Sequence, residues 1–448
     1  MIRYRARWVV PVSSPSIADG VVVVDGSTIA YVGGIDDAPD GDDENLGNVL
    51  LMPGLVNAHC HLELTAMRGF LEDLDFRSWI LRLVSARRAV LDRDALLDSA
   101  RFGLEEGIRA GITSYADTCE SGVVLQAMRE AGVRGIMYQE VFGPDPLQCA
   151  DQIAALKTTV EGQRYLETPL VRVGVSPHAT YTVSDDLFRA TADLAREQKL
   201  PVAIHIAESA MEQELVVDAT GGFADGLRAR GFTVESRGRT PVSLLEKLGV
   251  LDLSPLLIHC VRIDGADIAA IARSRSPVAH CPASNAKLGH GIAPLGQLLA
   301  AGITVGLGSD SMASNNRMDM LEEARMALLM SRSRSGSLNA PTAQDVLELA
   351  TIGGAKAIGI GDAVGTLEPG KQADLAAFSL DAVPPTYDPV TAAVFSTTGA
   401  RARFVCVAGS PLLRDGTLVL KRDGLAERMQ SLADALSEWQ ASQPAGSP

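Results

Sequence analysis

Between residues 55 and 307 the chain alternates short apolar runs, rich in β-branched residues, with longer segments in which apolar residues recur at helical spacing. The apolar runs lie at residues 55–62, 112–115, 133–141, 171–175, 201–206, 256–259, 277–280 and 303–307. Eight strand-then-helix units predict an α/β fold of the (β/α)8 TIM-barrel type, in which functional groups gather at the carboxyl ends of the strands. An open doubly wound sheet is the alternative, but the glycine-rich phosphate turn that it needs after its first strand is not found here.

The two chain ends have a different pattern, in which short β-branched runs are separated by Gly, Asp and Pro. Neither end offers enough apolar residues for a core of its own, so we expect both to pair in one small β-sandwich domain. The predicted organisation is residues 1–51 for the first part of the sandwich, 52–361 for the barrel, 362–422 for the second part, and 423–448 for a C-terminal helix and tail. That amphipathic helix is expected to dock on the protein's own surface or on the second subunit of a homodimer.

Two connections between the predicted strands are longer than usual. Residues 63–110 contain two helical patterns and Trp79, and residues 209–254 contain a glycine pair and the basic segment Arg237-Gly-Arg239. Long loops at a barrel mouth commonly act as lids or specificity walls, so we expect Trp79 to face the substrate.

Composition narrows the classes of function. The 40 basic and 55 acidic residues give a net charge of −15, which argues against a nucleic acid polymer and favours a small-molecule substrate. We expect no membrane partner and a cytoplasmic protein, because no apolar run reaches the roughly 18 residues of a spanning helix and the start does not resemble a secretory core. Six cysteines without a Cys-x-x-Cys pair do not suggest a disulfide framework or a cysteine zinc knuckle.

Four residues at the ends of the predicted strands form a candidate metal site. His59 and His61 point to the same face of the first strand because alternate side chains do so. His205 ends the fifth run, and Asp310 follows the eighth, which lies beside the first once a barrel closes. Three imidazoles and a carboxylate suit a catalytic zinc ion with a position open for water. The alternative is that each is an ordinary polar residue at a strand end.

Three residues are candidates for proton transfer. A divalent ion lowers the pKa of bound water from near 15.7 towards 7, and Asp310 is placed to accept the proton. Glu208, on the turn after His205, is placed to pass a proton to a ring nitrogen or leaving amine as a general acid. Its alternative role is that of a surface or helix-capping glutamate. His259, which closes the sixth run, is expected to hold the water or polarise a developing oxyanion.

The remaining histidines are assigned weaker roles. His178 and Tyr181, which follow the fourth run, are expected to donate hydrogen bonds to the substrate. His280 is expected to be buried and to shape its loop, and His290 to be an exposed loop residue. Because residues 171–178 offer no lysine to bridge a second metal, we expect a single ion.

Several of these stretches together resemble the amidohydrolase superfamily, in particular its aminohydrolase branch of nucleoside, nucleobase and triazine deaminases and chlorohydrolases. The matching stretches occur in order between residues 53 and 374 and are specific as a joint pattern. They are Pro53-Gly-Leu-Val-Asn-Ala-His-Cys-His61, His205-Ile-Ala-Glu208, His259-Cys-Val261, His280-Cys-Pro-Ala-Ser-Asn285, Gly308-Ser-Asp-Ser311 with Ala313-Ser-Asn-Asn316, and Gly365 to Asp374.

The resemblance implies a barrel with an appended β-sandwich and one zinc or iron ion bound by His59, His61, His205 and Asp310. It implies that Glu208 and His259 handle protons while hydroxide attacks an amino-substituted aromatic carbon and ammonia leaves. The segment His61-Leu-Glu-Leu-Thr65, with Arg68 and Trp79, looks most like the aminodeoxyfutalosine deaminases, whose substrate carries a carboxylate. Arg68, Arg82 and Lys287 are the candidates to meet that carboxylate, and the alternative for each is an ordinary surface cation.

Other functions remain open from the sequence. Adenosine, methylthioadenosine and S-adenosylhomocysteine are further candidate substrates of the deaminase. The same hydroxide could instead cleave an amide, a guanidine-like C–N bond or an aryl chloride. A barrel that has lost catalysis and serves as a scaffold is the alternative from a different class, and the presence of all four candidate ligands argues against it.

Overall fold

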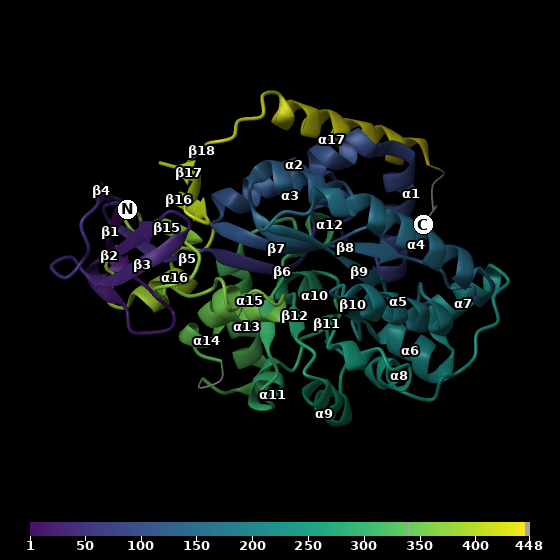
Figure 1. Ribbon diagram of the computed structural model, residues 1–448. Coiled ribbons are helices and arrows are strands. Elements are labelled where there is room, and N and C mark those ends of the chain that lie inside the picture. Colours follow the sequence, from purple (N-terminus) through teal and green to yellow (C-terminus); the bar gives the residue numbers. More distant parts are fainter. Residues whose placement is uncertain (339–340, 444–448) are drawn as a thin grey trace.

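The structure of the protein is a computed structural model that describes residues 1–338 and 341–443. Strands from both chain ends form one nine-stranded sheet, on the left of Figure 1. Its order is β18-β17-β16-β15-β5-β1-β2-β3, with β4 paired to β1. The strands are β1 (Ile2–Val9), β2 (Ile17–Asp25), β3 (Thr28–Gly34), β4 (Asp42–Asn45), β5 (Val49–Pro53), β15 (Leu375–Ser379), β16 (Ala402–Val407), β17 (Ser410–Arg414) and β18 (Thr417–Leu418).

The two chain ends pair directly through β5 and β15, which run antiparallel with Leu51 opposite Ala377. This sheet has a core of its own, in which Tyr4, Leu51 and Phe404 are buried together. The pairing follows the sequence prediction. The hydrogen bonds join the described strands in a single sheet, however, and do not divide them into the two sheets of a sandwich.

All eight apolar runs of the central region contain strands, and the strands are parallel. One sheet has the order β14-β6-β7-β8-β9 and the other β10-β11-β12-β13, and single bridges at Val175–Val202 and Ala179–His205 connect them. The strands are β6 (Leu55–His61), β7 (Ile112–Cys119), β8 (Arg134–Val141), β9 (Val171–Pro177), β10 (Ala203–Ile206), β11 (Leu256–His259), β12 (Val278–His280), β13 (Val305–Leu307) and β14 (Asp310–Ser311). Hydrogen bonding therefore assigns these strands to two sheets rather than to one continuous barrel sheet.

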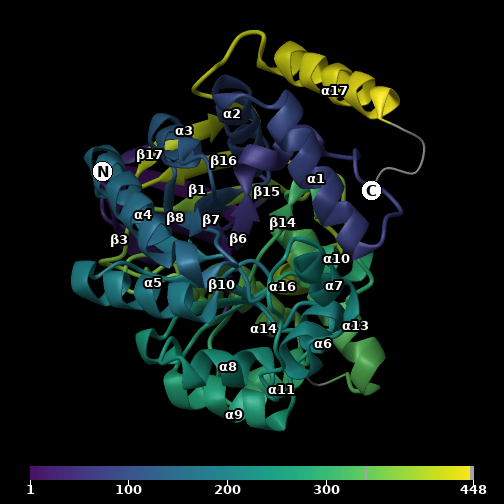
Figure 2. The same cartoon turned by 90° about the vertical axis from the view of Figure 1, so that its right-hand side faces the viewer.

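Helices lie around the central strands, as Figure 2 shows. Their starts follow ordinary capping chemistry; Ser184, for example, accepts a hydrogen bond from the Leu187 N–H at the start of α5, as its position in the sequence predicts. The helices are α1 (Phe76–Val90), α2 (Arg93–Arg109), α3 (Val123–Ala131), α4 (Cys149–Gln163), α5 (Asp185–Gln198), α6 (Ala210–Asp218), α7 (Gly221–Ala229), α8 (Pro241–Lys247), α9 (Gly265–Ser274), α10 (Pro282–Lys287), α11 (Leu295–Ala300), α12 (Met312–Asn315), α13 (Met320–Ser335), α14 (Ala343–Glu348), α15 (Gly354–Ala357), α16 (Pro389–Phe395) and α17 (Leu425–Ser442).

A buried ion pair connects the central strands to the nine-stranded sheet. The guanidinium of Arg134, at the start of β8, donates to both carboxylate oxygens of Asp374, with Nε to Oδ2 at 2.9 Å and Nη2 to Oδ1 at 3.0 Å. Asp374 Oδ1 also accepts a hydrogen bond from the Ala408 N–H, and the Asp374 carbonyl accepts one from the Gly54 N–H. One aspartate therefore binds segments from three parts of the chain.

The C-terminal helix α17 packs along α1 and α2, at the top of Figure 1. Its buried face includes Met429 and Leu436, its Trp439 ring lies 6.4 Å from that of Phe70, and Arg428 pairs with Asp98 on α2. The helix thus docks on the protein's own surface, one of the two sites that its amphipathic pattern predicts. In the described part of the chain, no helix has both the length and the apolar character needed to cross a membrane.

Candidate active site

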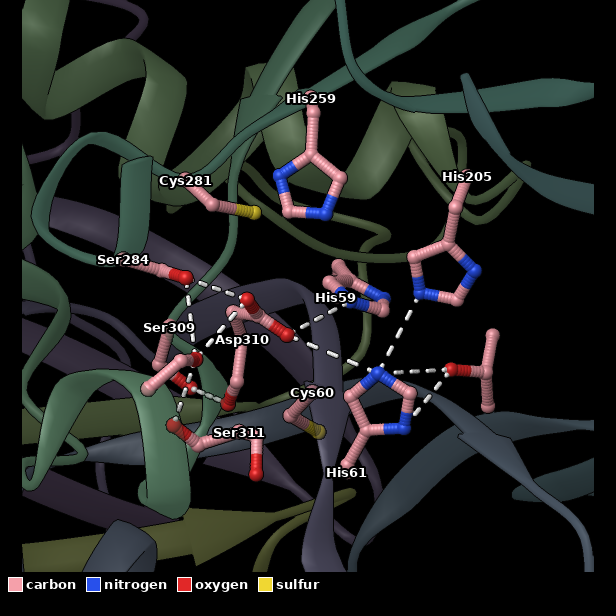
Figure 3. Close-up of polar contacts among 12 residues, drawn as sticks. His59, Cys60, His61, His205, His259, Cys281, Ser284, Ser309, Asp310 and Ser311 are labelled. Carbon is pink, nitrogen blue, oxygen red and sulfur yellow. Dashed lines mark hydrogen bonds and ion pairs between the residues drawn. The ribbon is translucent and has the colours of Figure 1, made fainter. Parts of the chain in front are cut away.

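The four predicted metal ligands lie together at the carboxyl ends of the central strands (Figure 3). Asp310 Oδ1 is 3.2 Å from His59 Nε2 and 3.5 Å from His61 Nε2, and His61 Nε2 is 3.3 Å from His205 Nε2. Ligand atoms placed tetrahedrally at zinc-binding distances stand roughly 3.3–3.5 Å apart. The residues present therefore fit a divalent ion of this size.

Strand pairing explains why these residues meet. In the parallel pairing of β14 with β6, Asp310 is opposite Cys60 and Ser311 is opposite His61, so the Asp310 carboxylate lies beside both β6 histidines. Cys60 points to the other face of β6, where its thiol is buried near Asp117. The alternation of side chains along one strand thus separates the two imidazoles from the thiol between them.

Hydrogen bonds hold the rings so that each Nε2 faces the centre of the site. His205 Nδ1 lies 3.1 Å from the His178 carbonyl oxygen, which can only accept, so Nδ1 carries the proton. His61 Nδ1 lies 3.2 Å from Thr118 Oγ1. Outer contacts of this kind fix the tautomer and the direction of metal-binding imidazoles.

Electrostatics favours neutral imidazoles around an ionised aspartate. Burial lowers the pKa of His59 to about 4 and the pKa of His205 well below its ordinary value. Burial by itself would raise the pKa of Asp310, but His59 and the other nearby imidazoles hold it well below its ordinary value. Asp310 Oδ2 also accepts hydrogen bonds from Ser284 Oγ and Ser314 Oγ, which leave Oδ1 facing the histidines.

Glu208 and His259 border this centre, and a ring nitrogen of His259 lies within 4.8 Å of ligand atoms of His59 and Asp310. His259 Nε2 is 3.7 Å from Glu208 Oε1, and His259 Nδ1 lies 2.9 Å from Asn285 Oδ1. Burial would raise the pKa of Glu208, yet the charges of His259 and His290 lower it below its ordinary value. Glu208 is only 4% exposed, so the alternative that it is a surface glutamate does not hold.

The prediction that His290 is an exposed loop residue is wrong. Its side chain is 4% exposed, and its Nε2 lies 3.2 Å from Glu208 Oε1. The residue is buried because the loop after α10 folds back towards the site, where the imidazole meets the ring of Phe76 edge to face at 4.4 Å. His280, in contrast, is buried as predicted.

Glu212, which was not predicted as a site residue, is hydrogen-bonded to the loop that carries Glu208. Its buried carboxylate accepts hydrogen bonds from the Glu208 N–H at 2.8 Å and from Thr180 Oγ1 at 2.8 Å. Thr180 lies between His178 and Tyr181, so Glu212 connects two loops of the site. In the sequence, Glu212 lies four residues after Glu208 on a predicted helix. This spacing does not tell whether its carboxylate faces Glu208 or the solvent.

An aromatic cluster lies next to these groups. Tyr181 stacks on Phe223 of α7 with ring centres 4.4 Å apart, and it meets Phe76 of α1 and His178 edge to face. Trp79 lies next to Phe76 and is buried, with no hydrogen-bond partner for its Nε1 among the described residues. These rings, from the two long connections and the loop after β9, form a buried apolar cluster that reaches His178.

Arg68, a predicted substrate-binding residue, forms an ion pair with the scaffold. Its guanidinium pairs with Glu106 on α2. The residue follows the short 3₁₀ helix η1 (Leu62–Met67), which packs against α2, and this packing carries the side chain to that helix. Its charge is therefore already matched by a carboxylate of the scaffold.

Glu140, at the end of β8, was also missed. A carboxylate oxygen of Glu140 and ring nitrogens of His178 and His205 all lie within 4.8 Å of one another. Its Oε1 is buried and has no hydrogen-bond partner among the described residues, and burial raises the pKa of this carboxyl well above its ordinary value. In the sequence, the acidic residue near the end of the apolar run 133–141 was the feature that could have indicated a site residue.

Comparisons with known proteins agree with this geometry. Residues 50–412 match the amidohydrolase family. The chain is 33% identical over 416 residues to a 5-methylthioadenosine/S-adenosylhomocysteine deaminase of Moorella thermoacetica, covering 91% of this chain and 93% of that protein. The structure of the present chain is similar to that of an adenosine deaminase from Xanthomonas campestris with bound zinc (TM-score 0.87, 28% identity, 98% of both chains). It also shares the fold of a Helicobacter pylori aminofutalosine deaminase (TM-score 0.81, 20% identity, 92% of this chain and 100% of that one).

Proposed function

Because the chain belongs to the amidohydrolase family, we propose that its strand-end site hydrolyses the exocyclic C–N bond of an adenine-type nucleoside and releases ammonia. The observation that supports this most directly is the convergence of His59, His61, His205 and Asp310 beside a buried Glu208. This arrangement combines a metal-binding set with a proton-transfer group in one site.

We further propose that the central strands close into an eight-stranded barrel spanning residues 52–361. The bridges from β9 to β10 support closure on one side. On the other side, β14 pairs with β6 and follows β13 of the second sheet closely in the chain. In this arrangement, the candidate ligands come from the first, fifth and eighth strands and reach one mouth. The paired ends, residues 1–51 and 362–422, are proposed to form the sandwich-like domain.

The proposed ligands of a single divalent ion are His59, His61, His205 and Asp310. Zinc suits this nitrogen and oxygen set, and ferrous iron is the alternative. When bound, such an ion would lower the pKa of a coordinated water towards 7 and so supply a nucleophile at neutral pH.

The residues around the metal site carry out proton transfer, charge stabilisation and substrate binding. Asp310, held by two serine hydroxyls, accepts the proton of the attacking water. Glu208 takes up the second proton of the water and passes it to the ring nitrogen next to the reacting carbon, and the proton on Asp310 goes to the leaving amine, so both water protons reach the products. His259, oriented by Asn285, stabilises the negative charge that develops on the incoming oxygen. His178 and Tyr181 donate hydrogen bonds to the heterocycle, while the aromatic cluster supports its face.

The relatives favour an adenine nucleoside that is modified at its 5′ position. Methylthioadenosine and S-adenosylhomocysteine, the compounds in the name of the Moorella relative, share the adenine ring and differ in the 5′ group. The resemblance to aminodeoxyfutalosine deaminases keeps that nucleoside among the candidates, although the solved structure of this type supports the fold alone.

The test is an ammonia-release assay on protein of measured zinc content. The panel contains adenosine, 5′-deoxyadenosine, methylthioadenosine, S-adenosylhomocysteine and aminodeoxyfutalosine. Glu208→Gln is expected to lower kcat about 10²- to 10⁴-fold at unchanged zinc content. Glu197→Gln, at an exposed position of α5, is the matched control and is expected to be neutral. Full activity of Glu208→Gln would refute the assigned role, and absence of ammonia release from every member of the panel would refute deamination of an adenine nucleoside.

A further inference from the structure

His290 lies next to Glu208 but has no role in the proposed reaction. Its Nε2 and the Nε2 of His259 face the same oxygen, Oε1 of Glu208, at 3.2 and 3.7 Å. The Glu208 carboxylate is therefore held between two imidazoles, and all three side chains are buried. A carboxylate with two nitrogen neighbours at one oxygen has fewer accessible rotamers than one held by a single contact.

The backbone after α10 places both imidazoles. The Asn285 side chain accepts the His259 Nδ1–H, and the Asn285 carbonyl accepts the His290 N–H at 2.9 Å. Gly289 and Gly291 have φ values of +71° and +109°, a region that favours glycine, and they let the loop turn back around His290. A single asparagine thus connects both neighbours of the Glu208 carboxylate.

The surroundings of His290 limit how its ring can move. On one side its ring meets Phe76 edge to face. On another side it lines a polar cavity of about 330 Å³ together with Gln213, Arg262 and Asp264. His290 therefore contacts the Glu208 carboxylate and also borders this cavity.

We propose that His290 is a positioning residue for the deamination, which holds Glu208 in the orientation needed for proton transfer to the substrate. This proposal rests on the proposed function, since it assigns His290 an action through Glu208. A displacement of about 1 Å at a reacting group can cost on the order of 100-fold in rate, so a buried residue whose ring nitrogen faces Glu208 can have a large effect.

The experiment compares two substitutions of His290 in the full-length, zinc-loaded enzyme. His290→Phe keeps a ring against Phe76 and removes the nitrogen, while His290→Gln keeps a donor. His290→Phe is expected to lower kcat about 100-fold with KM and zinc content changed less than about threefold, and His290→Gln is expected to recover at least tenfold of that loss. Equal activity of the wild type and both variants would overturn the proposal.

A double substitution separates positioning from packing. In a Glu208→Gln background, His290→Phe is expected to change kcat less than about threefold, because the group through which it acts has already been altered. Losses that multiply would instead show a role independent of Glu208 and would overturn the proposal. Should His290→Phe fail to fold, the same comparison is made with His290→Gln.

A crystal structure keeps this inference separate from the proposed function. In His290→Phe the Glu208 carboxylate is expected to leave its wild-type position beside His259, and an unchanged carboxylate would overturn the proposal whatever the substrate. Failure of the wild-type enzyme to release ammonia from any adenine nucleoside would refute the function but would leave this structural result intact.

Discussion

The buried pair of Arg134 and Asp374 should control the stability of the junction between the two sheets. The side chains are 8% and 1% exposed, and both carboxylate oxygens accept from the guanidinium. Arg134→Met keeps most of the side-chain volume but leaves the Asp374 carboxylate in the interior with the Ala408 N–H as its remaining side-chain contact. Loss of one partner from a buried ion pair costs about 3–5 kcal/mol.

This cost translates into a measurable change in melting temperature. An unfolding entropy of about 2.1 cal/mol/K per residue gives about 0.9 kcal/mol/K for 448 residues, so Arg134→Met is expected to lower Tm by roughly 3–5 °C. The measurement is differential scanning calorimetry at equal zinc content. The matched control is Arg101→Met, since Arg101 pairs with Glu130 at 2.9 Å but is 24% exposed. Such a partly exposed pair contributes about 1 kcal/mol or less.

The double variant Arg134→Met/Asp374→Leu provides the decisive comparison. Because neither charge then remains buried alone, its Tm is expected to fall less than the sum of the two single substitutions. A decrease in Arg134→Met no larger than that of Arg101→Met would refute the reasoning, as would additive losses in the double variant.

Three further outcomes follow from the site and its surroundings. Burial raises the pKa of Glu323 to about 8, even though Asn315 donates to it. Between pH 4.5 and about 8, Glu323 therefore keeps a proton in the folded protein that it has lost in the unfolded chain. Over this range the unfolding free energy should fall as pH rises, by up to about 1.4 kcal/mol per pH unit. Glu323→Gln should remove this component in urea titrations at several pH values, and an unchanged slope would contradict it. Asp310→Asn should lower bound zinc per chain, measured by metal analysis after dialysis; full retention would contradict its role as a ligand. Tyr181→Leu should raise KM about tenfold through loss of stacking on Phe223, whereas a fall in kcat alone would show that Tyr181 does not bind substrate.

Local patterns were sufficient to predict much of the fold because each strand has a chemical signature of its own. The run at residues 133–141, for example, corresponds to β8 at Arg134–Val141. The His59 and His61 pair was readable because the two-residue period of a strand puts both on one face. The place of Asp310 followed from strand order, since parallel strands bring their carboxyl ends to one edge.

The remaining parts of the site depend on loops, which have no such period. His290 has no neighbour in the sequence that indicates burial, and its contact with Glu208 exists because a loop between two short helices folds back. The ion pair of Arg68 with Glu106 was not predicted for a related reason, because the direction of the Arg68 side chain depends on the packing of η1 against α2. The aromatic cluster combines residues of α1, α7 and the loop after β9, which no single stretch reveals.

The docking of α17 on α1 affects the order in which parts of the protein form in a newly synthesised chain. All four candidate ligands leave the ribosome long before residues 425–442, whereas the packing of α17 on α1, which carries Phe76 and Trp79, forms after them. The linker before it exposes Val419 and Leu420 and offers proteases an accessible place to cut. A clipped chain that lacks α17 therefore keeps its four candidate metal ligands but loses a helix that packs on α1.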